Sequence, residues 1–212
     1  MHARRLLILG ATGGTGQHIL SQALQQGREV TVFVRSPQKL TTVHDHLRIV
    51  QGDVTRDPGP LADSVRGQDA VISALGVGNS LKSGGLIAAS MKVIAAAMER
   101  EGVRRLIFMS AYGVGATRID VPLLPRILMR LLLRDLYADK AAAEEDLRRS
   151  SLDWTLVYPA TLTNGPATGQ WRAGERLALS GFPRVPRADV ARFILTQVED
   201  ATYLRKGVLI SR

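Results

Sequence analysis

Short apolar runs alternate along this chain with longer segments in which apolar residues recur every three or four positions. Continuous apolar runs are typical of strands buried on both faces of a parallel sheet, and the longer spacing is typical of helices that cover such a sheet. Strands are expected at residues 6–9, 29–34, 47–51, 69–76, 105–110, 153–159 and 207–211. The pattern therefore predicts an α/β fold, doubly wound, with a mostly parallel sheet of about seven strands.

Helices are expected in the intervals between these strands. The first, at 17–26, places four apolar residues on one side: Ile19, Leu20, Ala23 and Leu24. A long helix follows a loop at 77–85 and ends at Gly102, with an inward stripe of Ile87, Met91, Ile94, Ala95 and Met98. Further helices are expected around 60–65, over 126–136, over 137–147 and from Arg187 onward. The pattern shows no repeat or linker, so we expect one domain over 1–212.

The turn between the first strand and the first helix spaces its glycines as Gly10-x-x-Gly13-x-x-Gly16. Gly10 permits a tight turn, Gly13 lets the backbone approach a pyrophosphate, and Gly16 lets helix and strand pack closely. Backbone N–H groups at the helix start then face the anion. Because a second strand pattern follows at 29–34, as a βαβ unit requires, the sequence predicts a dinucleotide site in a Rossmann-like domain.

The residue at the tip of the second strand indicates which dinucleotide is bound. An acid there binds the ribose 2′-hydroxyl of NAD, whereas a cation accommodates the 2′-phosphate of NADP. Arg35 stands at this tip, with Lys39 one turn further on, and so NADP(H) is preferred over NAD(H). Asp53 follows the third strand, where it either accepts from the adenine amino group or caps the helix around 60–65.

Composition narrows the remaining classes. The chain has no cysteine, which excludes disulfides, thiolate metal sites and a cysteine nucleophile, and it fits a reducing cytoplasm. Two histidines, His44 and His46, are too few for a metal site, and we expect none. The net charge of +9 is compatible with anionic ligands, but aromatic residues are only 5% and no basic run interleaves with them, so we expect no nucleic-acid partner.

Three arginines at four-residue spacing mark the expected helix at 126–136. Arg126, Arg130 and Arg134 would form one basic stripe beside a broad leucine surface. Such a helix either packs as a lid over the nucleotide site or lies on an anionic membrane surface. We expect the lid, and the membrane surface stays an alternative. The pattern leaves monomer and dimer both open.

Several segments together make the chain resemble a known family. They are 10–16, 32–35, 52–54, 68–72, Lys140 with 141–144, 151–155 and 187–191. On these residues the chain resembles the atypical short-chain dehydrogenase/reductase proteins with an NAD(P)H-binding domain, the group that includes biliverdin-IXβ reductase, also called flavin reductase. The resemblance covers nearly the whole chain.

The resemblance implies that NADPH lies across the carboxyl edge of the sheet. It assigns the pyrophosphate to Gly10, Thr12, Gly13, Gly14, Thr15 and Gly16, and the 2′-phosphate to Arg35. It assigns the adenine to Asp53 and Val54, and the ribose side to Ala74, Leu75 and Gly76. The nicotinamide end falls to Ser110, Pro159 and Leu162, and Lys140 reaches the nicotinamide ribose. The substrate side is expected from about 111–136 and 160–186, with Tyr112 and Thr161 at the substrate.

The match is weaker for catalysis. Standard members use a serine with Tyr-x-x-x-Lys, in which the lysine lowers the tyrosine pKa for proton transfer. This chain has Ser110 but spells Tyr137-x-x-Lys140, and it has Thr161 where the biliverdin reductase branch has a histidine. Ser110, Tyr137 and Lys140 are the catalytic candidates. Tyr137 either donates a proton or packs at the helix entrance.

The sequence thus predicts an NADPH-dependent oxidoreductase that transfers hydride to a small planar or carbonyl acceptor such as a flavin, a quinone or a ketone. An alternative is a redox-sensing or regulatory protein that binds NADP(H) without turnover. The altered tyrosine–lysine spacing favours the sensor, whereas Ser110 and Lys140 favour the enzyme.

Overall fold

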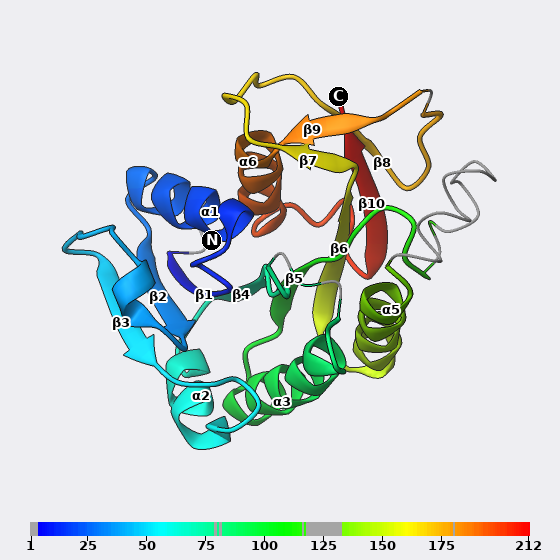
Figure 1. The fold of residues 1–212 in the computed structure, drawn as a ribbon. Coiled ribbons are helices and arrows are strands. Elements are labelled where there is room, and N and C mark those ends of the chain that lie inside the picture. The colour runs from blue at the N-terminus through cyan, green and yellow to red at the C-terminus, as the bar shows by residue number, and fades with distance from the viewer. Residues whose placement is uncertain (1–3, 79, 81, 116, 118–132, 180) are drawn as a thin grey trace.

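The structure is a computed structural model that describes residues 4–78, 80, 82–115, 117, 133–179 and 181–212. Its strands and helices alternate up to β6, as the hydrophobic pattern predicts, and three short strands then follow before the last helix (Figure 1). In order the elements are β1 (Arg5–Leu9), α1 (Gly14–Gln25), β2 (Glu29–Val34), η1 (Pro37–Lys39), β3 (Leu47–Gln51), α2 (Pro58–Val65), β4 (Ala70–Ser73), α3 (Leu86–Glu101), β5 (Arg105–Met109), α5 (Arg134–Arg149), β6 (Asp153–Pro159), β7 (Thr161–Thr163), β8 (Arg172–Gly174), β9 (Arg184–Pro186), α6 (Arg187–Gln197) and β10 (Lys206–Ser211).

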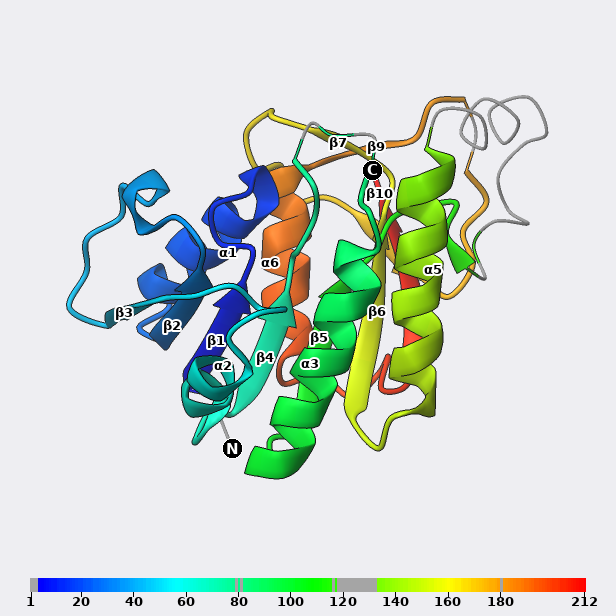
Figure 2. The ribbon, with the colours of Figure 1, turned by 60° about the horizontal axis from the view of Figure 1, so that its bottom comes forward.

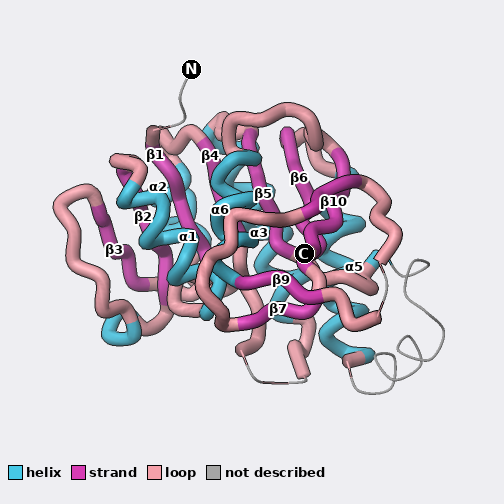
Figure 3. Tube along the Cα trace, turned by 90° about the horizontal axis from the view of Figure 1, so that it is seen from above, coloured by secondary structure: helices cyan, strands magenta, loops and turns pink. Residues whose placement is uncertain are grey.

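The main sheet has eight strands in the order β3-β2-β1-β4-β5-β6-β10-β8. All neighbours in it are parallel except β10 and β8, and a separate parallel pair, β7 and β9, lies beside the end of β6 (Figure 3). Strand order reverses between β1 and β4, and in open α/β sheets ligands bind at the carboxyl edge beside this reversal. The predicted doubly wound α/β fold is confirmed. The sequence pattern did not indicate β8 in this sheet, and it did not indicate the pair β7 and β9.

Helices cover both faces of the sheet (Figure 2). On one face α2, α3 and α5 bury a cluster that includes Leu7, Met91 and Phe108. On the other face α1 and α6 bury a second cluster that includes Ile8, Ile19 and Ile194. Because successive side chains of a strand point to opposite faces, the continuous apolar run of β1 supplies both clusters.

Most predicted elements appear where the pattern placed them, and the strands at 29–34, 47–51 and 153–159 have the expected bounds. The strand at 69–76 ends earlier, at Ser73. In the long helix Ala97 is buried, whereas Ala95 is only partly so. The first helix already starts at Gly14, although glycine disfavours helices, because close packing of Gly16 on the preceding turn outweighs local preference.

The segment 111–136 can be followed only in part. Residues 118–132, and with them Arg126 and Arg130 of the expected basic stripe, lie outside the described residues. The helix expected from Tyr137 starts one turn earlier, at Arg134. Within the part of the chain that the structure describes, no helix is long and apolar enough to cross a membrane.

Two carboxylates of α5 hold the start of α3. Asp139 accepts hydrogen bonds from the amides of Ile87 and Ala88 at 2.9 and 2.8 Å, which supplies the cap that Gly85, in left-handed conformation, cannot provide. One turn earlier Asp135 accepts from the amides of Ser83 and Gly84. The backbone at 83–88 is therefore fixed to α5, and the carboxylates of Asp135 and Asp139 already supply the negative charge that the start of α3 favours.

Candidate cofactor and active site

The glycine turn follows β1 at the carboxyl edge of the sheet. Gly10 has a φ of +83°, and a Cβ there would lie 2.6 Å from the Ala74 carbonyl oxygen, so only glycine fits beside the end of β4. A Cβ on Gly16 would lie 2.0 Å from the Gly10 carbonyl oxygen. Gly10 and Gly16 thus have the packing roles that the spacing predicts, and they bring the start of α1 against the strand ends.

The first turn of α1 fits an anionic ligand. The helix begins after Gly13, which has no side chain to cap it, and no acidic residue lies in its first turn. Its leading N–H groups therefore have no partner from a capping side chain, and together with the helix dipole they favour a phosphate. Thr15 is buried in this turn, while Gly13 and Gly14 are exposed. A dinucleotide pyrophosphate supplies the negative charge that this geometry favours.

A cation that the sequence analysis did not select also lies over this turn. Arg187 begins α6, and its Cδ and Nε lie 3.1 Å from the position that a Cβ of Gly14 would take. Its Nε donates to Oδ1 of Asn164 at 2.9 Å, and its Nη1 lies 3.5 Å from Oγ1 of Thr15. Among the described residues Arg187 has no ion-pair partner. A positive charge beside a helix N-terminus is unfavourable until an anion joins them.

The loop that holds Asn164 is anchored by a fully buried acid. Asp189 accepts from the amides of Thr168 and Gly169, each at 3.0 Å, and from the Thr168 hydroxyl at 2.6 Å. Despite the cost of burial, the hydrogen bond from the Thr168 hydroxyl, followed by those from the two amides, lowers the pKa of Asp189. The Arg187–Asp189 segment of the family pattern therefore orders the 164–170 loop above the glycine turn.

Residues assigned to the adenine side gather beyond β2 and β3. Arg35 and Lys39 are exposed, directly after β2 and in η1. Asp53 accepts from the Thr55 hydroxyl at 2.6 Å and from the Thr55 amide at 2.9 Å; these bonds, in that order, lower its pKa. The N-cap position of α2 is occupied by Asp57. The alternative in which Asp53 caps that helix is therefore wrong. Val54 is buried.

Residues assigned to the ribose and nicotinamide lie at the ends of β4 and β6. Ala74, Leu75 and Gly76 follow β4, and space near Gly76 is open, since a Cβ there would meet nothing within 4 Å. Pro159 ends β6, and Thr161 and Leu162 belong to β7. Thr161 is exposed and Leu162 partly buried. The fold thus brings these residues to the same sheet edge as the glycine turn, and their contacts with cofactor or substrate stay predictions.

Ser110 lies at the end of β5, inside a buried polar cluster. Its Oγ donates to Oε1 of Glu144 at 2.6 Å, and Glu144 is completely buried. The other carboxylate oxygen, Oε2, accepts from the Tyr158 hydroxyl at 2.8 Å and from Arg148 at 3.0 Å. Burial, followed by the nearby Glu144 carboxylate, raises the pKa of Tyr158 well above its usual range. The cluster is a carboxylate with a donor for each oxygen.

Lys140 is buried one helical turn before Glu144. Its Nζ donates to the Met109 carbonyl oxygen at 3.2 Å and lies 5.6 Å from the centre of the Phe108 ring. Burial lowers the pKa of Lys140 to about 8, against the opposing attraction of Glu144 and Asp139. The structure therefore brings Lys140 to the same strand end as Ser110.

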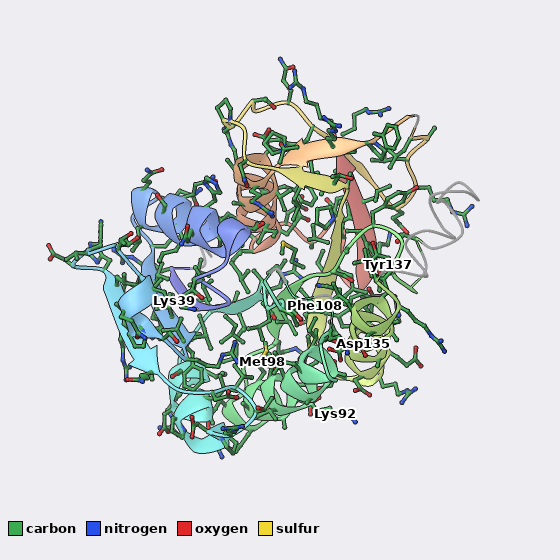
Figure 4. The ribbon with its side chains drawn as sticks, in the orientation of Figure 1. Lys39, Lys92, Met98, Phe108, Asp135 and Tyr137 are labelled. Atoms are coloured by element: carbon green, nitrogen blue, oxygen red, sulfur yellow. The ribbon has the colours of Figure 1, made fainter. Side chains whose placement is uncertain are left out.

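Tyr137 does not join this lysine. Its hydroxyl donates to the Tyr112 carbonyl oxygen at 3.2 Å, and burial raises the pKa of the Tyr137 phenol. The Tyr112 side chain is buried in the core cluster under α3 and α5. Figure 4 shows Tyr137 at α5 on one side of the molecule and Lys39 on the other side, with Phe108 between them. The usual tyrosine–lysine pair is not formed among the described residues, and a role for Tyr137 as proton donor stays a prediction.

The described residues hold no cluster of three or more His, Cys, Asp or Glu side chains suited to a metal ion. His44 and His46 lie with ring centres 5.5 Å apart, and the His46 amide donates to Nδ1 of His44. The two histidines therefore contact each other in the turn that precedes β3.

The reversal of strand order and the glycine turn define this chain as a Rossmann-fold nucleotide-binding protein. It belongs to the NAD(P)H-binding family, whose model matches residues 10–201. This confirms the resemblance on which the site assignments depend.

Comparison with known proteins agrees with this family. A chloroplastic protein of Arabidopsis thaliana is 32% identical over 178 residues, which cover 78% of this chain and 62% of that relative. The oxidoreductase aflX of Aspergillus parasiticus is 25% identical over 182 residues, covering 78% of this chain and 68% of aflX. A short-chain dehydrogenase/reductase of Veillonella parvula, solved in complex with NADP, superposes with a TM-score of 0.82 at 21% identity, covering 99% and 94% of the two chains. The chain is thus a member of the NAD(P)H-binding family, and one of its relatives is named an oxidoreductase.

Proposed function

We propose that this protein is an NADPH-dependent reductase that transfers hydride to a small planar or carbonyl acceptor. The observation that carries this proposal is the arrangement of one sheet edge, where the glycine turn follows β1, Ser110 follows β5 with only β4 between these parallel strands, and Lys140 of α5 donates to the Met109 carbonyl at the end of β5. Ligands of open α/β sheets bind at such an edge. A reductase of this kind also fits the cytoplasmic location that the absence of cysteine predicts.

The cofactor contacts follow from the charge and shape of the edge. The uncapped first turn of α1 would hold the pyrophosphate, with Thr12 and Thr15 beside it. Arg35 and Lys39 would hold the 2′-phosphate of NADPH, and Asp53 and Val54 would lie at the adenine. Space near Gly76 leaves the backbone after β4 open to the ribose.

Arg187 adds a contact to those that the sequence predicts. Asn164 holds the Arg187 side chain over Gly14, and we propose that the guanidinium donates a hydrogen bond to a pyrophosphate oxygen of the cofactor. A guanidinium forms short, charge-assisted hydrogen bonds to phosphate, and here it would complete the anion site of the helix terminus. This contact would serve NADPH and NADH equally, since the two cofactors share the pyrophosphate.

The acceptor end is formed by Ser110, Lys140, Pro159 and Leu162. When bound, the nicotinamide supplies the hydride, and the chain's own residues bind and orient the reactants. Lys140, with its pKa lowered to about 8, would lie near the nicotinamide ribose and can both donate and accept a proton near neutral pH. Ser110, held rigidly by Glu144, would position the carboxamide or the acceptor.

Titration of the purified protein with NADPH and NADH, followed by absorbance at the reduced nicotinamide band, tests the proposal. Flavin, quinone and ketone acceptors are then added in turn. Preferential binding of NADPH and its oxidation by one acceptor class are expected. Failure of both nucleotides to bind would overturn the account of the glycine turn.

One observation favours a second candidate, an NADP(H) sensor without turnover. The Tyr137 hydroxyl donates to the Tyr112 carbonyl and Lys140 donates to the Met109 carbonyl, so the groups that usually deliver a proton are engaged by backbone. Tight NADPH binding without oxidation by any acceptor in the same assay is the outcome that would favour the sensor.

A further inference from the structure

The hydroxyl of Ser110 carries one hydrogen, and its hydrogen-bond partner is the Glu144 carboxylate. Oγ of Ser110 lies 2.6 Å from Oε1 of Glu144. A carboxylate accepts hydrogen bonds only, so Ser110 is the donor as long as Glu144 is ionised. The direction of this bond therefore depends on the charge of Glu144.

The surroundings of Glu144 favour the ionised form. Arg148 and the Tyr158 hydroxyl both donate to Oε2, at 3.0 and 2.8 Å, and Lys140 lies one turn earlier on the same helix. A Cβ on Gly115 would lie 2.1 Å from Oε2, so backbone closely covers this oxygen. A completely buried carboxylate that accepts hydrogen bonds from a guanidinium and a phenol hydroxyl is stabilised in its charged form.

The buried Ser110 hydroxyl oxygen, at the end of β5, consequently has only lone pairs left for a ligand. Building on the proposed function, we infer that Ser110, with its proton committed to Glu144, is a hydrogen-bond acceptor that selects electron acceptors carrying an N–H group. Among planar acceptors, the N3–H of an isoalloxazine has this chemistry, whereas quinones and simple ketones offer only acceptor oxygens. In this assignment Ser110 contacts the substrate and Glu144 is a positioning residue.

A conservative substitution of Glu144 should reverse the direction of its hydrogen bond with Ser110. In Glu144→Gln the amide oxygen is drawn to the position of Oε2, because Arg148 and Tyr158 donate there. The amide NH2 then faces Ser110 and donates to it, so the serine hydroxyl becomes free to donate into the site. The change preserves shape and alters mainly hydrogen-bond direction and charge.

The experiment compares riboflavin with N3-methylriboflavin, which lacks the N–H. Binding is followed by flavin fluorescence in the presence of NADP+, so that it does not require turnover, and kcat/KM is measured with NADPH. For the wild-type protein we expect riboflavin to be favoured about fivefold to tenfold in both measurements, the scale of one lost hydrogen bond. In Ser110→Ala the ratio should approach one, and in Glu144→Gln it should approach one or invert.

Two controls and one fallback separate the explanations. Glu145→Gln changes an exposed neighbour that pairs with Arg149 and should keep the wild-type ratio. If Glu144→Gln does not fold, the ratio in Ser110→Ala carries the test. A cofactor analogue with acetyl in place of the carboxamide removes the other N–H donor that can reach this edge.

The outcomes are distinct. A flavin ratio that collapses in Ser110→Ala supports the inference. If Ser110→Ala weakens binding of NADP+ but not of the acetyl analogue, and the flavin ratio stays at its wild-type value, the donor is the cofactor carboxamide and the assignment to the acceptor is overturned. Equal losses for both flavins in Glu144→Gln would indicate a merely structural role and would also overturn it. Failure of the wild-type protein to bind NADPH would instead refute the proposed function.

Discussion

Arg187 and Asn164 are joined by a 2.9 Å hydrogen bond from Nε to Oδ1, which holds the guanidinium over the first turn of α1. The two residues come from the start of α6 and from the loop that Asp189 anchors. This pair gives the glycine turn a positive charge that is contributed from a distant part of the chain.

Replacing Arg187 by Gln should weaken NADPH and NADH binding by the same factor, about tenfold to a hundredfold, because a charge-assisted bond to the shared pyrophosphate is lost. Titration by nicotinamide fluorescence measures both affinities. Arg149→Gln, at an exposed arginine on α5, should change neither. A loss confined to NADPH would contradict a pyrophosphate contact.

Replacing Arg35 by Asp should, in contrast, affect the two cofactors differently. The cation that faces the 2′-phosphate is lost and an acid suited to the 2′-hydroxyl takes its place, so NADPH affinity should fall about a hundredfold while NADH affinity is kept or improved. The ratio of the two dissociation constants is the measurement. Arg48→Asp is the control, since this exposed residue lies near the amino end of β3. An unchanged ratio would remove Arg35 from the site.

Gly16→Ala should destabilise the fold as well as the site. The added Cβ would lie 2.0 Å from the Gly10 carbonyl oxygen. Because this oxygen belongs to the backbone, the clash cannot be relieved by rotating a side chain. We expect the free energy of unfolding to fall by about 3 kcal/mol, as for severe overpacking. Urea denaturation measures it. Gly59→Ala, in α2 with nothing within 4 Å of the new Cβ, should be neutral or slightly stabilising; equal effects at the two positions would argue against the close packing.

The buried Lys140 should make stability rise with pH. Its pKa is about 8 in the folded chain and 10.5 when unperturbed, so between these values the unfolded state binds more protons and unfolding becomes harder as pH increases. Between about pH 7.5 and 9.5 the wild-type protein should gain about 2 kcal/mol relative to Lys140→Met. Urea denaturation at the two pH values gives this difference. A parallel pH dependence of the two proteins would show that Lys140 is not the titrating group.

Much of the fold could be predicted because its signals are local. The strands at 29–34 and 153–159 are apolar on both sides, and such runs have few alternatives in an α/β chain. The short strand β8 was missed, since Arg172–Gly174 has no apolar run and becomes a strand only by pairing with β10. Asp53 had two local uses, and the helix cap was excluded only by the observed start of α2 after Asp57.

The candidate site divides in the same way. The positions of Ser110 and Lys140 at one sheet edge follow from strand ends and helix order, which a sequence contains. The importance of Glu144 had only a weak signal, the four-residue spacing of Lys140, Glu144 and Arg148, which also describes an ordinary helix surface. Arg187 belonged to the 187–191 segment of the family resemblance, but nothing near it in the chain indicates that α6 packs beside α1 and brings the guanidinium to the glycine turn.

The glycine turn, the alternation of strands and helices, and the cation after β2 are properties of neighbouring residues, and the sequence alone was sufficient for them. Three pairings came from tertiary structure alone: Ser110 with Glu144, Arg187 with the start of α1, and Tyr137 with the Tyr112 carbonyl. Backbone preferences and hydrophobic periodicity act over a few residues. Which charge meets which hydroxyl depends instead on the packing of elements that are far apart along the chain, and that packing directs the chemistry of this site.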